Sequence, residues 1–235
     1  NRADGAEVLA LAAKVANTVG AVTEDWNGFN VLHTEAAQVG GLDIGFVPGE
    51  GGKATGAMLE PGAMDVLFLL GVDEVEVPEG AFVVYQGTHG DRGAHRADVI
   101  LPGAAYPEKS GTYVNTEGRV QMGERAAFPP GEAREDWAIL RALSAQLGAA
   151  LPYDSLGALR AALYAAHPHM AAIDQIAEGD KSAVEALAGG STKTGSDAFH
   201  NAITDFYLTN PIARASATMA ECSALAKART AEAAE

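Results

Sequence analysis

The sequence contains a single cysteine, Cys222, among its 235 residues. A disulfide within the chain is therefore excluded, and so is an iron–sulfur cluster or zinc site whose ligands are all cysteine thiolates of this chain. One thiol fits a reducing compartment but does not identify one. Cys222 is either a packed, inert thiol or a redox-active one, and its place in an expected helix beside Met219 and Leu225 favours the packed thiol.

Basic residues are also scarce, because 16 Lys and Arg stand against 31 Asp and Glu, which gives a formal net charge of -15. Such an excess of negative charge repels phosphate backbones and anionic headgroups, so we expect neither nucleic acid nor direct lipid binding. An acidic surface also aids solubility, so the charge excludes partners without identifying one. The longest apolar run, near residues 66–72, is far shorter than the roughly 20 residues that span a bilayer. We therefore expect no membrane insertion by this chain.

Three short apolar runs lack the alternation of apolar and polar residues that is typical of a strand with one solvent-exposed face. They cover residues 65–71, 82–85 and 99–101, and each leads into a Gly or Pro. Continuous apolar strands are typical of a parallel sheet with both faces covered by helices. Ligand sites in such sheets lie at the carboxyl ends of the strands. The sequence therefore predicts an α/β fold, a Rossmann-like parallel sheet flanked by helices, followed by a helical C-terminal part.

Helical spacing of apolar residues predicts helices before and after these strands. Residues 7–20 form one pattern, with Gly20 at the C-cap, and residues 31–39 form a shorter one that ends at Gly40-Gly41. The later helices are expected from Trp137 to Leu147 before Gly148, around Leu156, Leu159 and Leu163 after Asp154 or Ser155 as N-cap, and from Pro211 to about Lys227 after Asn210 as N-cap.

The segment Pro129-Pro130-Gly131 marks the clearest boundary in a chain without internal repeats. Beyond it the apolar spacing becomes helical, and a polar, glycine-rich stretch later interrupts the helices. We therefore expect an α/β domain over residues 1–128, a helical continuation over 129–188, a flexible connector over 189–200, and a docking tail with a C-terminal helix over 201–235.

Two segments imitate ligand-binding motifs without meeting their requirements. Residues 48–55 are rich in glycine and contain Lys53, but a phosphate-binding loop needs Ser or Thr directly after this lysine, and Ala54 stands there. The segment His167-Pro168-His169 has a proline between its histidines and no Cys or Glu at helical spacing. We expect the first to be a surface loop and the second a surface turn.

Several blocks of sequence carry a family resemblance. Residues 97–121, ADVILPGAAYPEKSGTYVNTEGRVQ, resemble the segment shared by the molybdopterin oxidoreductase superfamily. WNGFNVLH at 26–33 is a further part of the match, and the blocks YQGTHGD at 85–91 and FYLTNP at 206–211 narrow the resemblance to one member of the superfamily. They are similar to the large iron–sulfur subunit (the 75-kDa or G subunit) of respiratory complex I.

This resemblance implies that the chain is the C-terminal portion of such a subunit, and a start at Asn1 rather than Met is expected of such a piece. In the family, a 2Fe–2S and several 4Fe–4S clusters are held by cysteine motifs in the N-terminal part, and those motifs do not occur here. Enzymes of the superfamily hold molybdenum or tungsten on a pterin, whereas complex I members are expected to keep the fold without that cofactor. We therefore assign no catalytic, cofactor-binding or metal-binding residue in this segment.

Residues 115–119, Asn-Thr-Glu-Gly-Arg, lie in the segment that approaches the pterin in the molybdopterin enzymes. One interpretation gives Asn115 and Arg119 hydrogen bonds to a phosphate or a pterin edge. The other makes the segment a buried polar turn, in which Arg119 pairs with a carboxylate while Gly111 and Gly118 supply unusual backbone angles. The complex I blocks on either side favour the turn.

A second polar loop, which contains His89, Asp91, Arg92 and His95, follows the expected strand at 82–85. It lies at the edge of the sheet where ligands are expected. Two histidines six residues apart on a glycine-containing loop lack the spacing of a fixed metal site. We therefore favour a structural or subunit-contact loop.

The leading hypothesis is a structural, non-catalytic segment of respiratory complex I, the NADH:quinone oxidoreductase that transfers electrons from NADH to quinone and couples this to proton translocation. Its expected partners are other peripheral-arm subunits, namely the NADH-oxidising subunit and the subunits of the quinone module. Such an assembly lies on the cytoplasmic side of a bacterial inner membrane or the matrix side of a mitochondrial one, attached through other subunits.

Two other functions stay open at the level of sequence. The chain is alternatively the C-terminal part of a pterin-dependent molybdenum or tungsten oxidoreductase such as a formate dehydrogenase, which would bind a pterin dinucleotide near residues 111–119. It is otherwise a free-standing acidic binding module, which would be soluble and monodisperse when expressed alone. The structural segment instead predicts exposed apolar patches and poor behaviour without partners.

Overall fold

The computed structural model describes residues 2–90, 92–176 and 178–232. Its Cα positions group into two compact units, each assembled from three separate stretches of chain. The first unit comprises Asn1–Asp43, Tyr113–Gln121 and Ala172–Thr204, and the second comprises Ile44–Thr112, Met122–Ala171 and Asp205–Glu235. The boundaries expected near residues 128, 188 and 200 stay a prediction.

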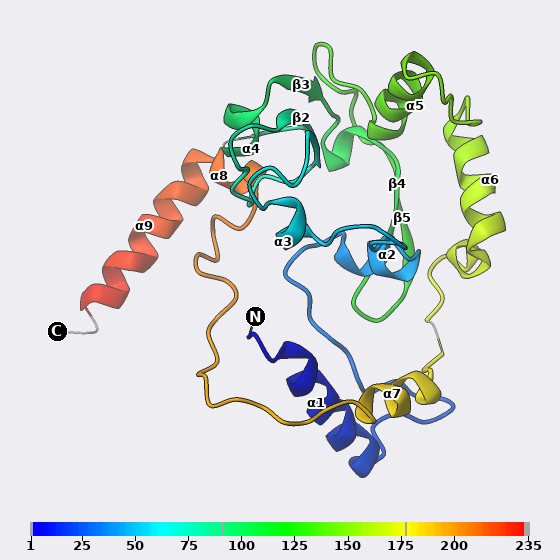
Figure 1. Ribbon diagram of the computed structural model, residues 1–235, viewed down its shortest axis with the longest axis vertical. Coiled ribbons are helices and arrows are strands. Elements are labelled where there is room, and N and C mark those ends of the chain that lie inside the picture. Colours follow the sequence, from blue (N-terminus) through cyan, green and yellow to red (C-terminus); the bar gives the residue numbers. More distant parts are fainter. Residues whose placement is uncertain (1, 91, 177, 233–235) are drawn as a thin grey trace. The chain divides into compact units, whose positions relative to one another are not determined.

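The second unit contains the predicted parallel sheet. Its strands are β1 (Val66–Leu70), β2 (Phe82–Gly87) and β3 (Val99–Pro102), in the order β1-β2-β3 with both pairings parallel. Figure 1 shows β2 and β3 beside α4 (Arg92–Arg96). With helices flanking the sheet and further helices in the C-terminal part, the predicted fold class is confirmed.

One face of this sheet holds the core of the second unit. Leu69, Val83 and Tyr85 are buried there, and Val75, Val77, Ala94 and Ala97 from the two strand connections pack against them. The other face does not follow the prediction, because β1 alternates between exposed and buried side chains. The expectation that both faces are covered is therefore wrong for the residues described, since both connections pack on the same face.

The helices after the sheet begin and end close to the predicted residues. α5 (Asp136–Gln146) is followed by Gly148, whose φ of 75° lets the chain turn away. α6 (Leu156–Ala166) is capped by Ser155, whose hydroxyl oxygen accepts a hydrogen bond from the Ala158 N–H at 3.1 Å. The structure thus selects Ser155 rather than Asp154 as the N-cap.

The last predicted helix is divided in two. Asn210 caps α8 (Pro211–Arg214) by accepting a hydrogen bond from the Ala213 N–H at 2.9 Å, as the Asn-Pro pair predicted. The chain then leaves the helix before α9 (Ala217–Glu232), and the Ser216 hydroxyl oxygen accepts from the Met219 N–H at 3.3 Å. A continuous helix from 211 to 227 is therefore wrong, because Ser216 provides a second N-cap.

The first unit packs two helices against each other through small side chains. α1 (Gly5–Val19) ends at Gly20, whose φ is 67°, and contacts α7 (Lys181–Ala188), as Figure 1 shows. The side of α1 that is buried consists of Ala10, Ala13 and Ala16. α7 was not predicted from the sequence, although Asp180 caps it by accepting from the Ala183 N–H at 3.1 Å.

Several shorter elements complete the described chain. The helix expected over 31–39 is wrong: α2 occupies Gln38–Asp43 and includes both glycines at 40 and 41, where Gly40 leaves room for Val114. Residues 48–54 are exposed, as predicted for a surface loop, and Lys53 donates to the Ala63 carbonyl at 3.0 Å. The remaining elements are α3 (Thr55–Met58), β4 (Gly111–Val114), β5 (Val120–Gly123) and two 3-10 helices, η1 (Tyr106–Glu108) and η2 (Pro168–Ala171).

β4 and β5 form a separate two-stranded sheet, which the sequence did not predict. Among the described helices, none combines the length and the apolar character needed to cross a bilayer.

Candidate functional site

Three polar side chains meet where β2 ends, and we call Gln86, Lys109 and Asp136 the edge cluster. The fully buried Gln86 donates its Nε2 hydrogens to Asp136 Oδ1 at 3.0 Å and to the Asp136 carbonyl at 3.3 Å. The Lys109 ammonium pairs with Asp136 Oδ2. The carboxyl end of β2, where a ligand is expected in an open α/β sheet, is thus joined to the first residue of α5.

A second polar contact lies at the end of β1, where Asp73 is fully buried. Its Oδ1 accepts a hydrogen bond from the Gly93 N–H of α4 at 2.8 Å, and its Oδ2 lies 2.9 Å from Nη2 of Arg214. Arg214 also reaches Glu74 at 3.1 Å. One carboxylate therefore joins β1, α4 and the C-terminal segment, and a Cβ at position 93 would lie 2.9 Å from it. No local sequence pattern predicts this contact, because its partners are 141 residues apart.

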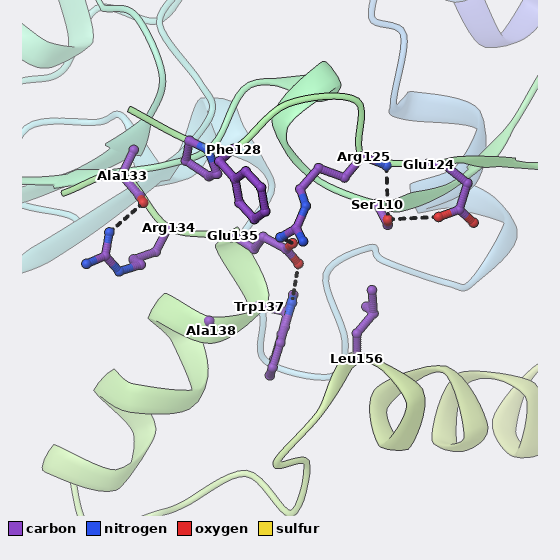
Figure 2. Close-up of a pocket in the computed structure, with 11 residues that line it drawn as sticks. Ser110, Glu124, Arg125, Phe128, Ala133, Arg134, Glu135, Trp137, Ala138 and Leu156 are labelled. Atoms are coloured by element: carbon purple, nitrogen blue, oxygen red, sulfur yellow. Dashed lines mark hydrogen bonds and ion pairs between the residues drawn. The ribbon is translucent and has the colours of Figure 1, made fainter. Parts of the chain in front are cut away.

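A cavity of about 610 Å³ lies between the residues after β5 and the start of α5, and we call it the Trp137 pocket. The Arg125 guanidinium lies 4.5 Å from the centre of the Phe128 ring. Glu135 accepts from the Trp137 Nε1–H at 2.7 Å and lies 3.4 Å from Arg125. Figure 2 shows the Arg125, Glu135 and Trp137 side chains turned toward one another. The pocket thus combines an aromatic wall with a neutralised pair of charges.

The loop after β2 does not bring its two histidines onto one element. His89 is the second residue after β2, and its carbonyl accepts from the Tyr85 hydroxyl, whereas His95 lies in the last turn of α4. Asp91, which was considered with them, lies outside the described residues. Within residues 2–90, 92–176 and 178–232, no group of three or more His, Cys, Asp or Glu is placed to hold a metal ion.

The other residues considered from the sequence lie far from these contacts along the chain. His167 follows α6 and His169 lies in η2, with their rings 6.1 Å apart, edge to face. Cys222 is half-buried in α9, next to the buried Ser223. Whether its thiol is inert stays a prediction.

In the first unit, the residues 115–119 form the tip between β4 and β5. The Asn115 side-chain oxygen accepts from the N–H groups of Glu117 and Arg119, both at 3.0 Å. Arg119 donates to the Asp174 carbonyl at 2.8 Å and lies 3.5 Å from the Glu117 carboxylate. Gly118 has a φ of 79°, as expected, whereas Gly111 is an ordinary residue of β4, so that expectation was wrong for Gly111. The tip is half-buried to exposed rather than buried.

Two ionised groups organise segments that follow the sheet in sequence. Asp4 accepts from Arg2 at 2.7 Å and from the Gly195 N–H at 2.7 Å, and chiefly the Arg2 hydrogen bond holds the pKa of Asp4 far below its ordinary value. These contacts fasten one point of the stretch from 189 to 200, and its flexibility stays a prediction.

Asp205 anchors α9 in the second unit. It accepts from the Ser223 hydroxyl at 2.6 Å and from the Tyr207 N–H at 3.1 Å, and Lys227 lies 2.9 Å away. The hydrogen bond from Ser223, followed by that from Lys227, lowers the pKa of Asp205.

This lowered pKa predicts an acid-sensitive C-terminal helix. A carboxyl group with a depressed folded-state pKa stabilises the folded state above its unfolded pKa of about 4, and the stabilisation is lost as the pH falls through the folded-state value. We expect amide hydrogen exchange in α9, corrected for intrinsic rates, to accelerate as the pH drops below about 4. The Asp205→Asn variant should exchange faster at neutral pH and lose most of this pH dependence. An unchanged pH profile in that variant would show that Asp205 does not hold the helix.

Two protein-family models match the chain. Residues 1–146, more than half of the chain, match the model described as molybdopterin oxidoreductase. The chain belongs to the molybdopterin oxidoreductase family. Residues 170–222 match a second model, which describes the C-terminal part of the G subunit of NADH-ubiquinone oxidoreductase. The family assignment expected from the sequence motifs is therefore confirmed.

Relatives in this family show which branch the chain resembles. It is 46% identical over 215 residues to the mitochondrial NADH-ubiquinone oxidoreductase 78 kDa subunit of Neurospora crassa, a match that covers 88% of this chain and 28% of that protein. It is 42% identical over 230 residues to the NADH-ubiquinone oxidoreductase 75 kDa subunit of Reclinomonas americana, covering 96% of this chain and 33% of that protein. A third relative, the mitochondrial NADH dehydrogenase [ubiquinone] iron-sulfur protein 1 of Solanum tuberosum, is 43% identical over 230 residues, or 97% of this chain and 30% of that protein.

The chain thus spans about a third of the length of these relatives. Together with the second family model, their names support the respiratory subunit over the alternative of a formate dehydrogenase.

The family raises the question of whether this chain's residues fit a pterin. The two polar side chains considered for that role are engaged within the first unit: Asn115 holds the turn through its side-chain oxygen, and Arg119 holds the Asp174 carbonyl and the Glu117 carboxylate. The Asn115 side-chain oxygen and the Arg119 guanidinium are thus already used within the tip, and a pterin edge or phosphate that bound through these atoms would have to displace those contacts. An iron–sulfur cluster does not fit, because such clusters need several thiolates and the chain has one.

Proposed function

We propose that this chain is a structural segment of the large iron–sulfur subunit of a respiratory NADH:quinone oxidoreductase. It builds folded protein around redox centres that other parts of that subunit hold, and it carries no catalytic, cofactor-binding or metal-binding residue of its own. The proposal extends the names of the relatives to this chain, which matches about a third of their length.

The proposal depends mainly on what the basic side chains of the family motifs bind. Lys109 and Arg119, both in the stretch 97–121, bind Asp136 and the Asp174 carbonyl. Arg214, in the block that follows FYLTNP, binds the buried Asp73. In an enzyme site such groups face a substrate, whereas here each holds two distant stretches of the same unit together. These contacts support a structural role for the motifs.

As partners we propose the NADH-oxidising subunit and the subunits of the quinone module. As a location we propose the matrix side of the mitochondrial membrane, or the cytoplasmic side of a bacterial one, with attachment through other subunits. Two of the relatives carry the word mitochondrial in their names, which supports the first of these.

Purification of the native polypeptide through an affinity tag tests this proposal. We expect the tagged polypeptide to copurify with NADH-oxidising activity and with iron, and to contain no stoichiometric molybdenum or tungsten. A polypeptide that purifies alone with one molybdenum or tungsten per chain would overturn the proposal and favour the alternative, a pterin-dependent oxidoreductase.

The Arg119→Ala variant is expected to weaken the first unit without changing any redox signal. It loses the hydrogen bond to the Asp174 carbonyl and the contact with Glu117, so we expect the free energy of unfolding to fall by about 1 kcal/mol. Urea unfolding followed by the fluorescence of Trp26, which lies in the first unit, measures this in a Trp137→Phe background. The matched variant Arg119→Lys keeps the charge but not the planar fork, and should recover only part of the loss. A changed iron–sulfur spectrum in the native polypeptide would contradict a structural role.

A further inference from the structure

One face of the sheet in the second unit exposes apolar side chains of all three strands, whereas the opposite face buries the side chains of β1 and β2 and exposes Ile100 of the edge strand β3. Partners in the parallel register point to the same side, and Val66 lies opposite Phe82, Phe68 opposite Val84, and Val84 opposite Val99. We call the surface of Val66, Phe68, Leu70, Phe82 and Val99 the open face; these side chains are between 38 and 53% exposed.

The chain's own strand connections do not cover this face. Val75 and Val77, from the connection between β1 and β2, pack on the opposite face with Leu69 and Val83. Ala94 and Ala97, from the connection between β2 and β3, pack there too. Consecutive parallel strands with connections of one hand place all of these connections on one side of the sheet. A cover for the open face must therefore come from outside the stretch 66–102.

One helix already touches this side of the sheet. Gln86 continues the row that Phe82 and Val84 begin, and its amide binds Asp136 at the start of α5. α5 thus sits at the carboxyl end of this face, and the apolar surface continues from there toward the amino ends of the strands. The open face extends an existing contact between a helix and the sheet.

We infer that an amphipathic helix from another part of the longer polypeptide covers the open face. This inference rests on the proposed function, since the relatives are about three times as long as the matched region and so supply further chain. Parallel sheets occur almost only with both faces covered, and the covering element is usually a helix with an apolar stripe. A second copy of this chain is a poor cover, because it would bring two molecules of net charge -15 together.

Cysteine labelling at positions of β1 and β2 tests the inference. Leu70→Cys and Phe82→Cys place thiols on the open face, and Leu69→Cys places one on the buried face of the same strand. All three are made with Cys222→Ser, both in the 235-residue chain and in the native polypeptide that contains it. The measurement is the rate at which the peptide that carries the introduced thiol reacts with a water-soluble maleimide, followed by mass spectrometry of the digest, because the proposed subunit contains further cysteines. Sedimentation reports the oligomeric state.

In the 235-residue chain, we expect Leu70→Cys and Phe82→Cys to react readily and Leu69→Cys to react slowly. In the native polypeptide, we expect both open-face thiols to slow by at least about tenfold, while Leu69→Cys stays slow. Open-face thiols that react equally fast in both proteins would overturn the inference. Open-face thiols that react slowly in the 235-residue chain would also overturn the inference, because a second copy or the chain itself would then cover the face.

This test separates the inference from the proposed function. The labelling rates do not depend on NADH, so a covered face in a polypeptide without NADH-oxidising partners leaves the inference standing and overturns the function. A polypeptide that copurifies with those partners but keeps the open face reactive supports the proposed function and overturns the inference. If Leu69→Cys fails to fold, Leu70→Cys and Phe82→Cys alone still decide, because the comparison lies between the two proteins.

Discussion

Replacement of Arg214 by alanine is expected to destabilise the second unit by about 3 kcal/mol. Asp73 is fully buried and faces Arg214 at 2.9 Å, so the variant takes the Arg214 guanidinium away from a carboxylate in the interior. Removal of one member of a buried pair costs more than the pair contributes, because the remaining charge stays desolvated. Urea unfolding followed by the fluorescence of Trp137, in a Trp26→Phe background, measures the change in the second unit.

The matched control for this prediction is Asp154→Ala. It breaks another Arg–Asp pair of the same unit, between Arg141 and Asp154 at 2.8 Å, but the Asp154 side chain is 88% exposed. An exposed pair of this kind contributes at most about 1 kcal/mol. Equal effects of the two variants would show that the contact between Asp73 and Arg214 does not tie the C-terminal segment to the sheet.

The second large effect is expected from Asp136→Ala, which should lower the free energy of unfolding of the second unit by about 2 kcal/mol. This variant removes the acceptor of the fully buried Gln86 amide and the partner of Lys109 at the same time. A buried donor without an acceptor costs its full desolvation, which is the reason for the size of the effect. The same Trp137 fluorescence measures it.

Asp136→Asn distinguishes the two contributions in the edge cluster. Its side-chain oxygen can still accept from Gln86, whereas the charge that binds Lys109 is gone. We expect the free energy of unfolding to fall clearly less in this variant than in Asp136→Ala. A loss as large as that of the alanine variant would assign the effect to Lys109 rather than to the buried amide.

Local signals in the sequence predicted the ends of elements well. Gly20 ends α1 with a positive φ, and Ser155 and Asn210 cap their helices through their own side chains. These signals depend only on neighbouring residues, which is why they can be read without the fold. The break before α9 was missed because Ser216 stands among the alanines 213, 215 and 217, which favour an uninterrupted helix, and has no Gly or Pro beside it.

The contacts that join distant stretches could not be predicted in the same way. Asp73 and Arg214 are 141 residues apart, and no local pattern relates them. The apolar run of β1 indicated a strand but not which of its faces is covered, since both faces carry apolar residues and only tertiary contacts differ between them. The hairpin of β4 and β5 was likewise hidden, because its residues read as a motif with many polar side chains.

The family resemblance supplied what local patterns could not. It indicated the molybdopterin oxidoreductase superfamily, which the family model over residues 1–146 confirms. It also indicated the respiratory branch, which the family model over residues 170–222 confirms. The roles of single residues came from the structure instead: Arg119 was considered for a pterin, and its partners turned out to be Asp174 and Glu117.

The most direct test of this account is the metal content of the 235-residue chain, purified anaerobically without chelators from a host that makes iron–sulfur clusters and the molybdenum–pterin cofactor. With one thiol, and with Asn115 and Arg119 engaged in the fold, the chain should retain far less than one iron or molybdenum atom per molecule. A stoichiometric centre that disappears in Cys222→Ser or Arg119→Ala would show that the chain holds a redox centre with its own side chains, and would contradict its structural role.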